Sequence, residues 1–428
     1  MLKFDVHPSS LQGSLTVPPS KSHTLRAIFF AALAKGTSSI EHFLHSPDTM
    51  AMIEAVRLFG AEVKIHENHL EIHGCAGKLN SPQDVIQCGN SGLVLRLIGA
   101  LAGLSPHYTI LTGDASIRQN RPVQPLLEGL NQLGAFAISS LGNGHAPIIV
   151  KGPLTGSNAV VDGEDSQPIS GLLIAAAFAP YPIELHVKNP GEKPWVQLTL
   201  DWFEKLGIPC QSSDYTYYRT EGNAQINGFT YRVPGDFSTA AFPIVAALIT
   251  RSQLTLHNIN MKDSQGDKAI IPLLQKMGAR FIIDEKKQTL TIQSGTKLQG
   301  TVVDINDFID ALPILAVLGC FAEGQTEIIN GEIARKKESD RIHLMAKELK
   351  KMGADIEERQ DGLIINPTQL YGTELYAHSD HRLALALTTA ALAAKTPSKI
   401  LGVECIAKTY SRFCEDFRAI GANIGETT

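Results

Sequence analysis

The sequence repeats one pattern six times, with a period of roughly 70 residues. In each repeat, an amphipathic segment ends in a glycine that precedes a small or apolar residue and a strand-like run. These glycines are Gly60, Gly134, Gly207, Gly278, Gly353 and Gly421, and they recur at nearly equal intervals. Glycine is favoured at a helix end because a left-handed backbone suits a residue without Cβ. The pattern therefore predicts six similar helix-containing units.

A second series of positions has the same period. Each unit also contains a polar cluster directly before a helix-like run rich in Ala, Leu and Ile, and this cluster lies well before the glycine in the sequence. The marker residues are Ser22, Asn90, Ser166, Ser238, Asp310 and Asp380, which are also nearly evenly spaced. Two independent series that agree on one period indicate a repeat architecture over nearly the whole chain.

Each unit is expected to run as strand, buried helix, strand, exposed helix and one or two further strands. The first helix is apolar nearly all round, as in residues 383–394, which predicts a position inside a layer. The second is amphipathic, as in DRIHLMAKELKKMG at 340–353, so one of its faces should meet solvent. The units differ too much for a uniform solenoid, so we expect two lobes of three units each.

Two similar proline-containing segments mark the expected connections between the lobes. VPPSKS at 17–22 and VPGDFS at 233–238 both place proline after valine and shortly before a helix start. Proline fixes φ and would stiffen both connections. The predicted division is one lobe of residues 1–18 and 234–428, a second lobe of residues 19–233, and crossovers near 18–21 and 233–236.

Composition narrows the class of protein. The 428 residues include 38 Lys and Arg and 43 Asp and Glu, a net charge of −5, which argues against a general nucleic-acid coat. With 43% hydrophobic and 19% charged residues, the chain can build a sizeable core. No apolar run reaches the roughly 20 residues that span a bilayer. The start MLKFDVHPSS lacks the apolar region of a signal peptide, so no secretory signal is expected. The six cysteines form no Cys-x-x-Cys pair, so a reduced, cytoplasmic enzyme is expected.

The expected helix starts carry groups that bind anions. A helix N-terminus has free N–H groups and about half a positive charge. The side chains at the buried-helix starts are Lys21, Ser22, Arg26, Asn90, Ser91, Gly92, Ser166, Gln167, His381 and Arg382. The starts of the second helices add Arg121, Lys193, Lys337, Arg341 and Lys408. Their concentration in an acidic protein indicates a focused site for phosphate or carboxylate groups, although helix caps and solvated charges are the alternative.

The acid–base candidates are fewer. Asp310 stands inside the start of an apolar helix, where a carboxylate is costly unless it is paired or used, although a first-turn acid favoured by the helix dipole is an alternative. Glu338 lies among lysines and arginines, and a solvated ion-pair network is its alternative. His381 is a proton carrier or a helix cap, and Trp195 beside Lys193 is expected to face a ligand.

Seven motifs occur in the order that characterises one enzyme family. They are SKSHTLRA at 20–27, GNSG followed by Arg96, RPV at 121–123, DSQ at 165–167, KESDRI at 337–342, DHR at 380–382 and AKT at 407–409. The set resembles 5-enolpyruvylshikimate-3-phosphate (EPSP) synthase along essentially the whole chain. The resemblance implies a two-lobed inside-out α/β barrel of six βαβαββ repeats, three per lobe. It also implies transfer of the enolpyruvyl group of phosphoenolpyruvate to the 5-hydroxyl of shikimate 3-phosphate, with release of phosphate and without metal or organic cofactor.

The resemblance also assigns roles to particular residues. Those implied to be catalytic are Asp310, which orients and deprotonates the hydroxyl, Glu338, which protonates the methylene, and Lys21. Those implied to bind phosphoenolpyruvate are Lys21, Asn90, Gly92, Arg121, Arg341, Arg382 and Lys408. Those implied to bind shikimate 3-phosphate are Lys21, Ser22, Arg26, Ser166, Gln167, Asp310 and Lys337, with His381 and Trp195 as possible contributors. Gly92 implies sensitivity to the inhibitor glyphosate, and a monomer is expected, with no nucleic-acid or membrane partner.

The chain also departs from the family pattern. Asp165 replaces a common serine, and we expect it to repel a phosphate or to turn outward; Glu192 and Trp195 stand where serine and tyrosine are common. Three other functions are alternatives, and the sequence argues against each of them. A UDP-N-acetylglucosamine enolpyruvyl transferase would carry a reactive-loop cysteine where Ala115 stands. A catalytically silent anion binder would not need Asp310 and Glu338. An RNA-phosphate cyclase would need a basic surface, which the net charge of −5 does not provide.

Overall fold

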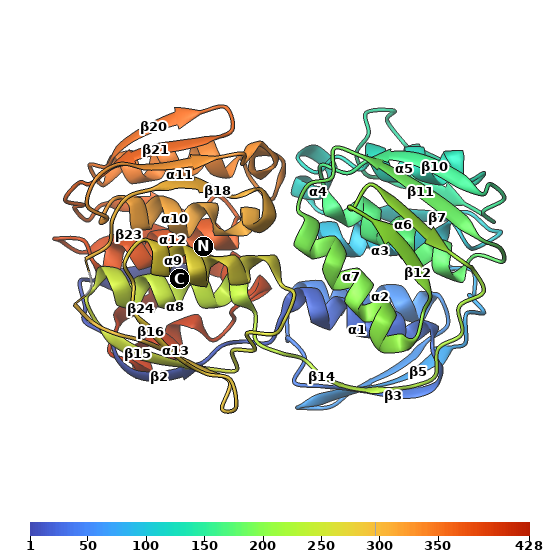
Figure 1. The fold of residues 1–428 in the computed structure, drawn as a ribbon, viewed down its shortest axis with the longest axis horizontal. Coiled ribbons are helices and arrows are strands. Elements are labelled where there is room, and N and C mark those ends of the chain that lie inside the picture. Colours follow the sequence, from blue (N-terminus) through green and yellow to red (C-terminus); the bar gives the residue numbers. More distant parts are fainter. Residues whose placement is uncertain (296) are drawn as a thin grey trace. The chain divides into compact units, whose positions relative to one another are not determined.

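The chain forms two compact units in the computed structural model, which describes residues 1–295 and 297–428. One unit, here called the terminal lobe, contains Met1–Pro18 and Pro234–Thr428. The other, the middle lobe, contains Pro19–Val233. The chain therefore leaves the terminal lobe after its first two strands and returns to it for the last half of the sequence (Figure 1).

The described residues form six four-stranded sheets that share one topology. In each sheet an edge strand pairs in parallel with its neighbour. That neighbour pairs antiparallel with the third strand, which in turn pairs antiparallel with the fourth. Parallel neighbours need a crossover. One buried helix supplies it in four of the sheets, whereas long stretches of chain separate β3 from β14 and β2 from β15. The common topology is the structural counterpart of the repeat seen in the sequence.

The middle lobe holds three of these sheets and seven helices within its described residues. The first sheet is β14 (Thr230–Arg232), β3 (Lys35–Glu41), β5 (His69–Cys75) and β4 (Glu62–Ile65); the second is β6 (Ile86–Gln87), β7 (Thr109–Thr112), β9 (Ile148–Lys151) and β8 (Phe136–Ser139); the third is β10 (Asn158–Asp162), β11 (Ile183–Lys188), β13 (Tyr217–Thr220) and β12 (Cys210–Ser213). The helices are α1 (Lys21–Leu33), α2 (Pro47–Leu58), α3 (Gly92–Ala102), α4 (Ala115–Gln119), α5 (Gln124–Gln132), α6 (Ser166–Phe178) and α7 (Lys193–Leu206).

The terminal lobe repeats the arrangement and draws two strands from the N-terminal segment. Its sheets are β2 (Gln12–Thr16), β15 (Gln253–His257), β17 (Thr289–Ile292) and β16 (Phe281–Asp284); β18 (Val302–Asp304), β19 (Thr326–Ile329), β21 (Gly362–Asn366) and β20 (Asp355–Arg359); and β22 (Glu374–Tyr376), β23 (Ser398–Leu401), β1 (Lys3–His7) and β24 (Asn423–Thr427). Its α-helices are α8 (Phe237–Ile249), α9 (Ile270–Lys276), α10 (Leu312–Gly319), α11 (Arg341–Lys351), α12 (His381–Leu392) and α13 (Phe413–Ala419). Its 3₁₀ turns are η1 (Gly266–Ala269), η2 (Asn306–Ala311), η3 (Glu332–Lys336) and η4 (Val403–Lys408).

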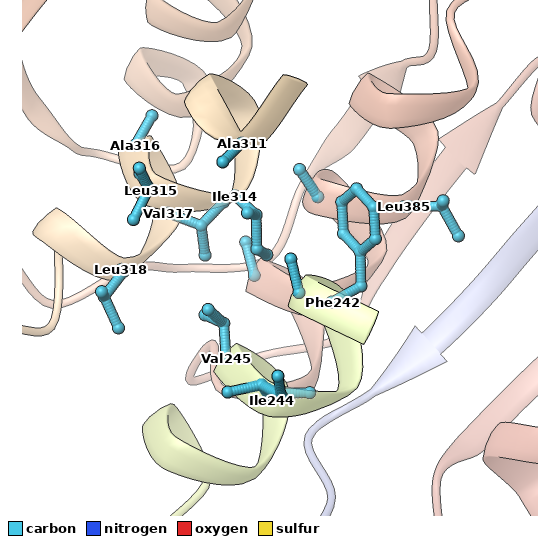
Figure 2. Packing of buried hydrophobic residues seen from close by; sticks show 14 of the residues in the cluster. Phe242, Ile244, Val245, Ala311, Ile314, Leu315, Ala316, Val317, Leu318 and Leu385 are labelled. Atoms are coloured by element: carbon cyan, nitrogen blue, oxygen red, sulfur yellow. The ribbon is translucent and has the colours of Figure 1, made fainter. Parts of the chain in front are cut away.

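The first helix of each unit forms the core, as the uniform apolar character of these segments predicts. Every residue of α12 is buried, and α8 and α10 pack against it around Phe242, Ile314 and Leu385 (Figure 2). A separate cluster of buried apolar side chains fills the middle lobe, with α3 packed on α6. Burial on all sides leaves only the helix ends available for polar chemistry.

Five of these six buried helices begin with a side-chain cap, which is a serine or an aspartate in each case. The capping residues are Ser20, Ser91, Asp165, Asp236 and Asp380, each accepting a backbone N–H of the first turn. The exception is α10, which has no side-chain cap and instead continues from the 3₁₀ turn η2. Asp310 belongs to that turn, so the expectation that it lies within the apolar helix is wrong by two residues.

The six repeat glycines all adopt a positive φ, between 69° and 109°, and each follows an exposed helix of its unit. This confirms them as helix stops. The two-lobed α/β architecture with six repeats is also confirmed. Within the described ranges, no helix is long and apolar enough to cross a membrane.

The close contact of α3 and α6 generates a prediction at Gly171. A Cβ there would lie 2.8 Å from the carbonyl oxygen of Arg96 and 3.1 Å from the Cβ of Ala100. Although alanine is the better helix former, overpacking against a backbone carbonyl costs about 1–3 kcal/mol. Gly171→Ala should therefore lower the thermal melting temperature.

Differential scanning calorimetry checks this prediction against Gly425→Ala, whose new Cβ would meet Asp5 at an ordinary 3.5 Å. The control should melt like the unmodified chain. Equal melting temperatures for the two variants would contradict the tight packing of α3 on α6.

Candidate active site

In the terminal lobe, one buried guanidinium binds three carboxylates. Arg341, the first residue of α11, is only 1% exposed. Its Nε donates to Asp380 Oδ2 at 2.8 Å, its Nη1 to Asp310 Oδ1 at 2.7 Å and its Nη2 to Glu338 Oε2 at 2.8 Å. Arg341 thus joins side chains from η2, the start of α11 and the start of α12.

Two of these three acids, Asp310 and Glu338, each bind a further cation. The Nη2 of Arg382 lies 2.6 Å from Asp310 Oδ2, and the Nζ of Lys408 lies 2.7 Å from Glu338 Oε1. Both Glu338 and Lys408 are buried, so the alternative of a solvated ion-pair network at Glu338 is wrong. Buried ion pairs of this kind require good geometry, because both charges lose their hydration.

The charges fix the ionisation of the cluster. Burial alone would raise the pKa of Asp310, but the positive charges of Arg382, Arg341 and Lys337 outweigh it and hold that pKa well below the usual range of a carboxyl. Burial likewise opposes the charge of Arg341, but Asp380, Glu338 and Asp310 raise its pKa above that of an ordinary guanidinium. Asp310 is therefore an ionised carboxylate, and a weak base, while both arginines remain on it.

The start of α12 is held by Asp380. Its carboxylate caps the helix by accepting the Arg382 N–H at 2.9 Å, and it also accepts the hydroxyl of Ser339 at 3.0 Å. His381 is the first residue of the helix and is buried, with Nδ1 3.7 Å from Asp380 Oδ1. The cap is therefore Asp380, not His381 as one alternative had it.

In the middle lobe, the starts of α3 and α6 share one arginine. Arg96 donates to the carbonyl of Gly92 at 3.2 Å, and its Nη2 lies 3.1 Å from Asp165 Oδ2. Asp165 also caps α6 by accepting the Gln167 N–H at 3.0 Å. The outward orientation considered for Asp165 is wrong, because Arg96 neutralises this acid and holds it at the helix start.

The loop before α3 brings Asn90 and Arg121 together. The Nη1 of Arg121 donates to the Asn90 carbonyl at 3.3 Å, and Asn90 Nδ2 donates to Asp114 Oδ2 at 2.7 Å. A Cβ at Gly92 would lie 2.6 Å from Arg121 Nη1 and 2.8 Å from Arg96 Nη1. Glycine at this position lets two guanidinium groups approach the helix N-terminus.

Arg26 is a fully buried cation without a carboxylate partner among the described residues. Its donors go to neutral oxygens: Thr199 Oγ1 at 3.0 Å, the Trp195 carbonyl at 3.2 Å, and the Ser22 carbonyl at 3.3 Å. Burial lowers its pKa to about 10, which leaves it charged at neutral pH. An uncompensated buried charge is costly, so this position favours an anionic ligand.

A carboxylate already lies at the start of α6. Glu192 is buried and has a positive φ of 45°, and its Oε2 accepts both the backbone N–H and the hydroxyl of Ser166 at 3.2 Å. Gln167 follows Ser166 in the same turn. Trp195, one turn into α7, is half-buried, and its carbonyl accepts from Arg26. Elsewhere in this lobe Lys21 Nζ lies 3.7 Å from Asp48 Oδ2.

The candidates thus divide into two sets, one in each lobe. The middle-lobe set is Lys21, Ser22, Arg26, Asn90, Gly92, Arg121, Ser166, Gln167 and Trp195; the terminal-lobe set is Asp310, Lys337, Glu338, Arg341, His381, Arg382 and Lys408. Sequence reasoning assigned no role to Arg96, although an arginine inside an apolar run was a visible signal. It missed Asp48 and Asp267, which lie in polar stretches that carry no such signal.

Asp267, in η1, is the least satisfied acid of the terminal lobe. Its side chain is completely buried, and neither carboxylate oxygen has a hydrogen-bond partner among the described residues. Burial, and then the charge of Asp310, raise its pKa well above the usual range. The nearby Ser238 hydroxyl donates to Asp236 at 2.6 Å, and the charge of Arg382 only partly opposes the rise in the pKa of Asp267. Burial and the charge of Asp310 therefore favour the protonated form of Asp267.

We expect Asp267→Asn to stabilise the protein at pH 7–8. In the unfolded chain the carboxyl ionises above about pH 4, whereas burial in the folded protein raises its pKa, so the penalty grows as pH rises from that value. Removing a penalty of about 1–3 kcal/mol should raise the melting temperature by about 2 °C or more. Calorimetry at pH 8 and pH 4.5 checks this, and a gain as large at pH 4.5 would contradict it.

A family model and curated relatives match the chain along its length. The EPSP synthase (3-phosphoshikimate 1-carboxyvinyltransferase) model matches residues 6–417. The 3-phosphoshikimate 1-carboxyvinyltransferase of Chlamydia caviae is 43% identical and covers 100% of this chain and 95% of its own length. The enzyme of that name from Acetivibrio thermocellus is 40% identical over 98% of each chain.

Solved structures agree with these matches. The structure of EPSP synthase from Acinetobacter baumannii superposes with a TM-score of 0.83 at 27% identity, covering 100% of both chains. Identity above 40% to a relative of nearly the same length is sufficient to assign the family. The chain belongs to the EPSP synthase (3-phosphoshikimate 1-carboxyvinyltransferase) family and is a transferase.

Proposed function

We propose that the two residue sets carry out one reaction, the transfer of the enolpyruvyl group of phosphoenolpyruvate to the 5-hydroxyl of shikimate 3-phosphate, with release of phosphate. The observation that carries the assignment of residues is the terminal-lobe cluster, in which the buried Glu338 and the half-buried Asp310 pair with Arg341, Arg382 and Lys408. Two carboxyl groups beside these cations suit a reaction that moves two protons.

The reaction needs two carboxyl groups in different protonation states. A proton must be added to the methylene carbon of phosphoenolpyruvate while the acceptor hydroxyl loses one and its oxygen bonds to the adjacent carbon. Loss of a proton from the new methyl group and departure of phosphate then restore the double bond. We assign Asp310 to the hydroxyl and Glu338 to the carbon, with Lys337 and Lys21 stabilising the negative charges.

The ion pairs suggest how Asp310 becomes a base. Phosphoenolpyruvate carries a carboxylate and a phosphate, which compete with Asp310 and Glu338 for Arg341, Arg382 and Lys408. An opposite charge within about 4–6 Å changes a carboxyl pKa by about 1–3 units. When the substrate takes over these cations, the pKa of Asp310 should rise by that order, and its basicity with it.

The remaining binding roles follow the same logic. In the middle lobe we assign Asn90, Gly92 and Arg121 to phosphoenolpyruvate, because guanidinium and backbone N–H groups gather at the start of α3. We assign the buried Arg26, with Ser22, Ser166 and Gln167, to shikimate 3-phosphate, and Trp195 to one face of its ring. His381 remains a possible contributor through its contact with Asp380.

Partners and location form part of the same proposal. We propose a monomer that works in the cytoplasm, an environment in which the six cysteines would remain free thiols as they are here. Burial raises the pKa of Cys88 and Cys405 to about 12, which suits structural thiols and not nucleophiles. The related UDP-N-acetylglucosamine transfer is not favoured, because Ala115 begins α4 where that enzyme would need a cysteine.

Phosphate release tests the proposed reaction. The purified chain is incubated with phosphoenolpyruvate and shikimate 3-phosphate, with UDP-N-acetylglucosamine, or without acceptor. We expect release only with shikimate 3-phosphate, and glyphosate should inhibit it because Gly92 places no side chain at the start of α3. Release only with the nucleotide sugar would contradict the acceptor assignment.

The Asp310→Asn variant separates an enzyme from a silent binder in the same assay. Loss of a general base should lower kcat by about 100-fold or more. Binding of phosphoenolpyruvate, measured by calorimetry, should persist because Arg341, Arg382 and Lys408 remain. Unchanged turnover in this variant would remove Asp310 from the mechanism.

Glu192 provides a prediction about the acceptor. Its carboxylate lies where the phosphate of shikimate 3-phosphate would meet the Ser166 N–H and hydroxyl, so the two anions should compete. A repulsion of about 1–2 kcal/mol corresponds to roughly tenfold in affinity. Glu192→Gln should therefore bind shikimate 3-phosphate about tenfold more tightly.

Shikimate without phosphate and the Glu204→Gln variant are the matched controls. Glu204 lies on the exposed face of α7, so its substitution changes net charge equally but leaves Ser166 untouched. Tighter binding of unphosphorylated shikimate by Glu192→Gln, or equal gains in both variants, would contradict direct competition at Ser166.

A further inference from the structure

We propose that Glu348 is a positioning residue that holds the turn before α12, and thereby aims Arg382 at phosphoenolpyruvate. The inference rests on the proposed role of Arg382 in binding that substrate. It concerns a carboxylate outside the cluster of Asp310 and Glu338. Three observations on α11, on the turn and on their contacts support it.

Glu348 and Arg341 lie on one face of α11. They are separated by two helical turns, so their side chains project from the same side. Arg341 binds Asp380 at the start of α12, and Glu348 contacts Tyr376 and His378, which shortly precede Asp380. One helix face therefore holds the same short segment at two points.

The carboxylate of Glu348 is completely buried and its oxygens are satisfied by three donors. Oε2 accepts the backbone N–H of Tyr376 at 3.0 Å and the Nζ of Lys351 at 2.7 Å, and Oε1 lies 2.9 Å from His378 Nε2. Burial works against its charge, but these donors outweigh it and lower the pKa of Glu348. It is therefore an ionised anchor at neutral pH.

The turn that Glu348 holds has a backbone that needs an anchor. His378 and Ser379 are consecutive non-glycine residues with φ of 52° and 56°. Such conformations persist only when the surroundings impose them. The backbone bonds that flank them, Ala377 N–H to the Leu401 carbonyl and Asp380 N–H to the Ala377 carbonyl, both at 2.9 Å, fix the ends but neither side chain.

The direction of α12 depends on this turn. Asp380 caps the helix, and Arg382 reaches Asp310 from its first turn. If Glu348 released His378, the two strained residues could relax and the first turn of α12 would rotate. Arg341 would still hold Asp380, but Arg382 would lose its fixed orientation toward the anion.

The experiment compares Glu348→Ala and Glu348→Gln with Glu357→Gln, an exposed carboxylate on β20. We expect KM for phosphoenolpyruvate to rise about tenfold or more in Glu348→Ala, with kcat changed less than about threefold, because the chemistry of Asp310 and Glu338 is untouched. KM for shikimate 3-phosphate should change little, since Arg26 and Ser166 lie in the middle lobe. Glu348→Gln should show a smaller effect in the same direction, and Glu357→Gln none.

Variants of the turn identify the contact. His378→Gln keeps a donor that can reach Glu348 and should retain a nearly normal KM, whereas His378→Asn tolerates the backbone but is too short and should resemble Glu348→Gln. A purely stabilising role for Glu348 would lower the melting temperature without the selective change in KM. That result, or equal rises in KM for both substrates, would overturn the proposal.

Hydrogen exchange separates this inference from the proposed function. Amides of residues 376–382 should exchange faster in Glu348→Gln than in Glu357→Gln, whether or not the chain turns over phosphoenolpyruvate. If the unmodified protein shows no turnover, the proposed reaction fails while this comparison still decides the role of Glu348. Unchanged exchange in residues 376–382 would overturn that role.

Discussion

The terminal lobe is organised around the burial of one guanidinium group. Arg341 has lost nearly all contact with water, and its charge is tolerable only because Asp310, Glu338 and Asp380 surround it. These acids come from segments far apart in the sequence. The βαβαββ repeat brings them together because it places each buried helix start at an equivalent position. The packing that buries Arg341 therefore depends on its ion pairs, because removing the carboxylates would leave an uncompensated buried charge.

The two lobes meet the demands of anion binding differently. The terminal lobe neutralises its cations with its own carboxylates, whereas the middle lobe leaves Arg26 without a carboxylate among the described residues. At the start of α6 the middle lobe uses a carboxylate as well, since Glu192 lies on Ser166. We therefore propose that the substrates displace the protein's own carboxylates from these hydrogen-bond donors. The protein's carboxylates keep those donors in place while the substrates are absent.

The sequence predicted the repeat and most of the charged residues, because periodic helices and helix stops leave a strong local signal. Gly207 and the apolar α12 are examples. It did not predict which charges pair. The bond of Asp165 to Arg96 depends on the close contact of α3 with α6. The contact of Glu348 with His378 depends on a turn with positive φ angles at two residues that are not glycine, so the sequence gives no signal for this turn.

The most direct test of this mechanism is a crystal structure with shikimate 3-phosphate and a non-reactive phosphoenolpyruvate analogue. The decisive quantity is the separation of Arg382 Nη2 from Asp310 Oδ2, now 2.6 Å. We predict that this contact breaks and that an analogue oxygen takes the place of Asp310 on the guanidinium. An intact Arg382–Asp310 pair, with the analogue bound elsewhere, would contradict the exchange of anions on which the mechanism depends.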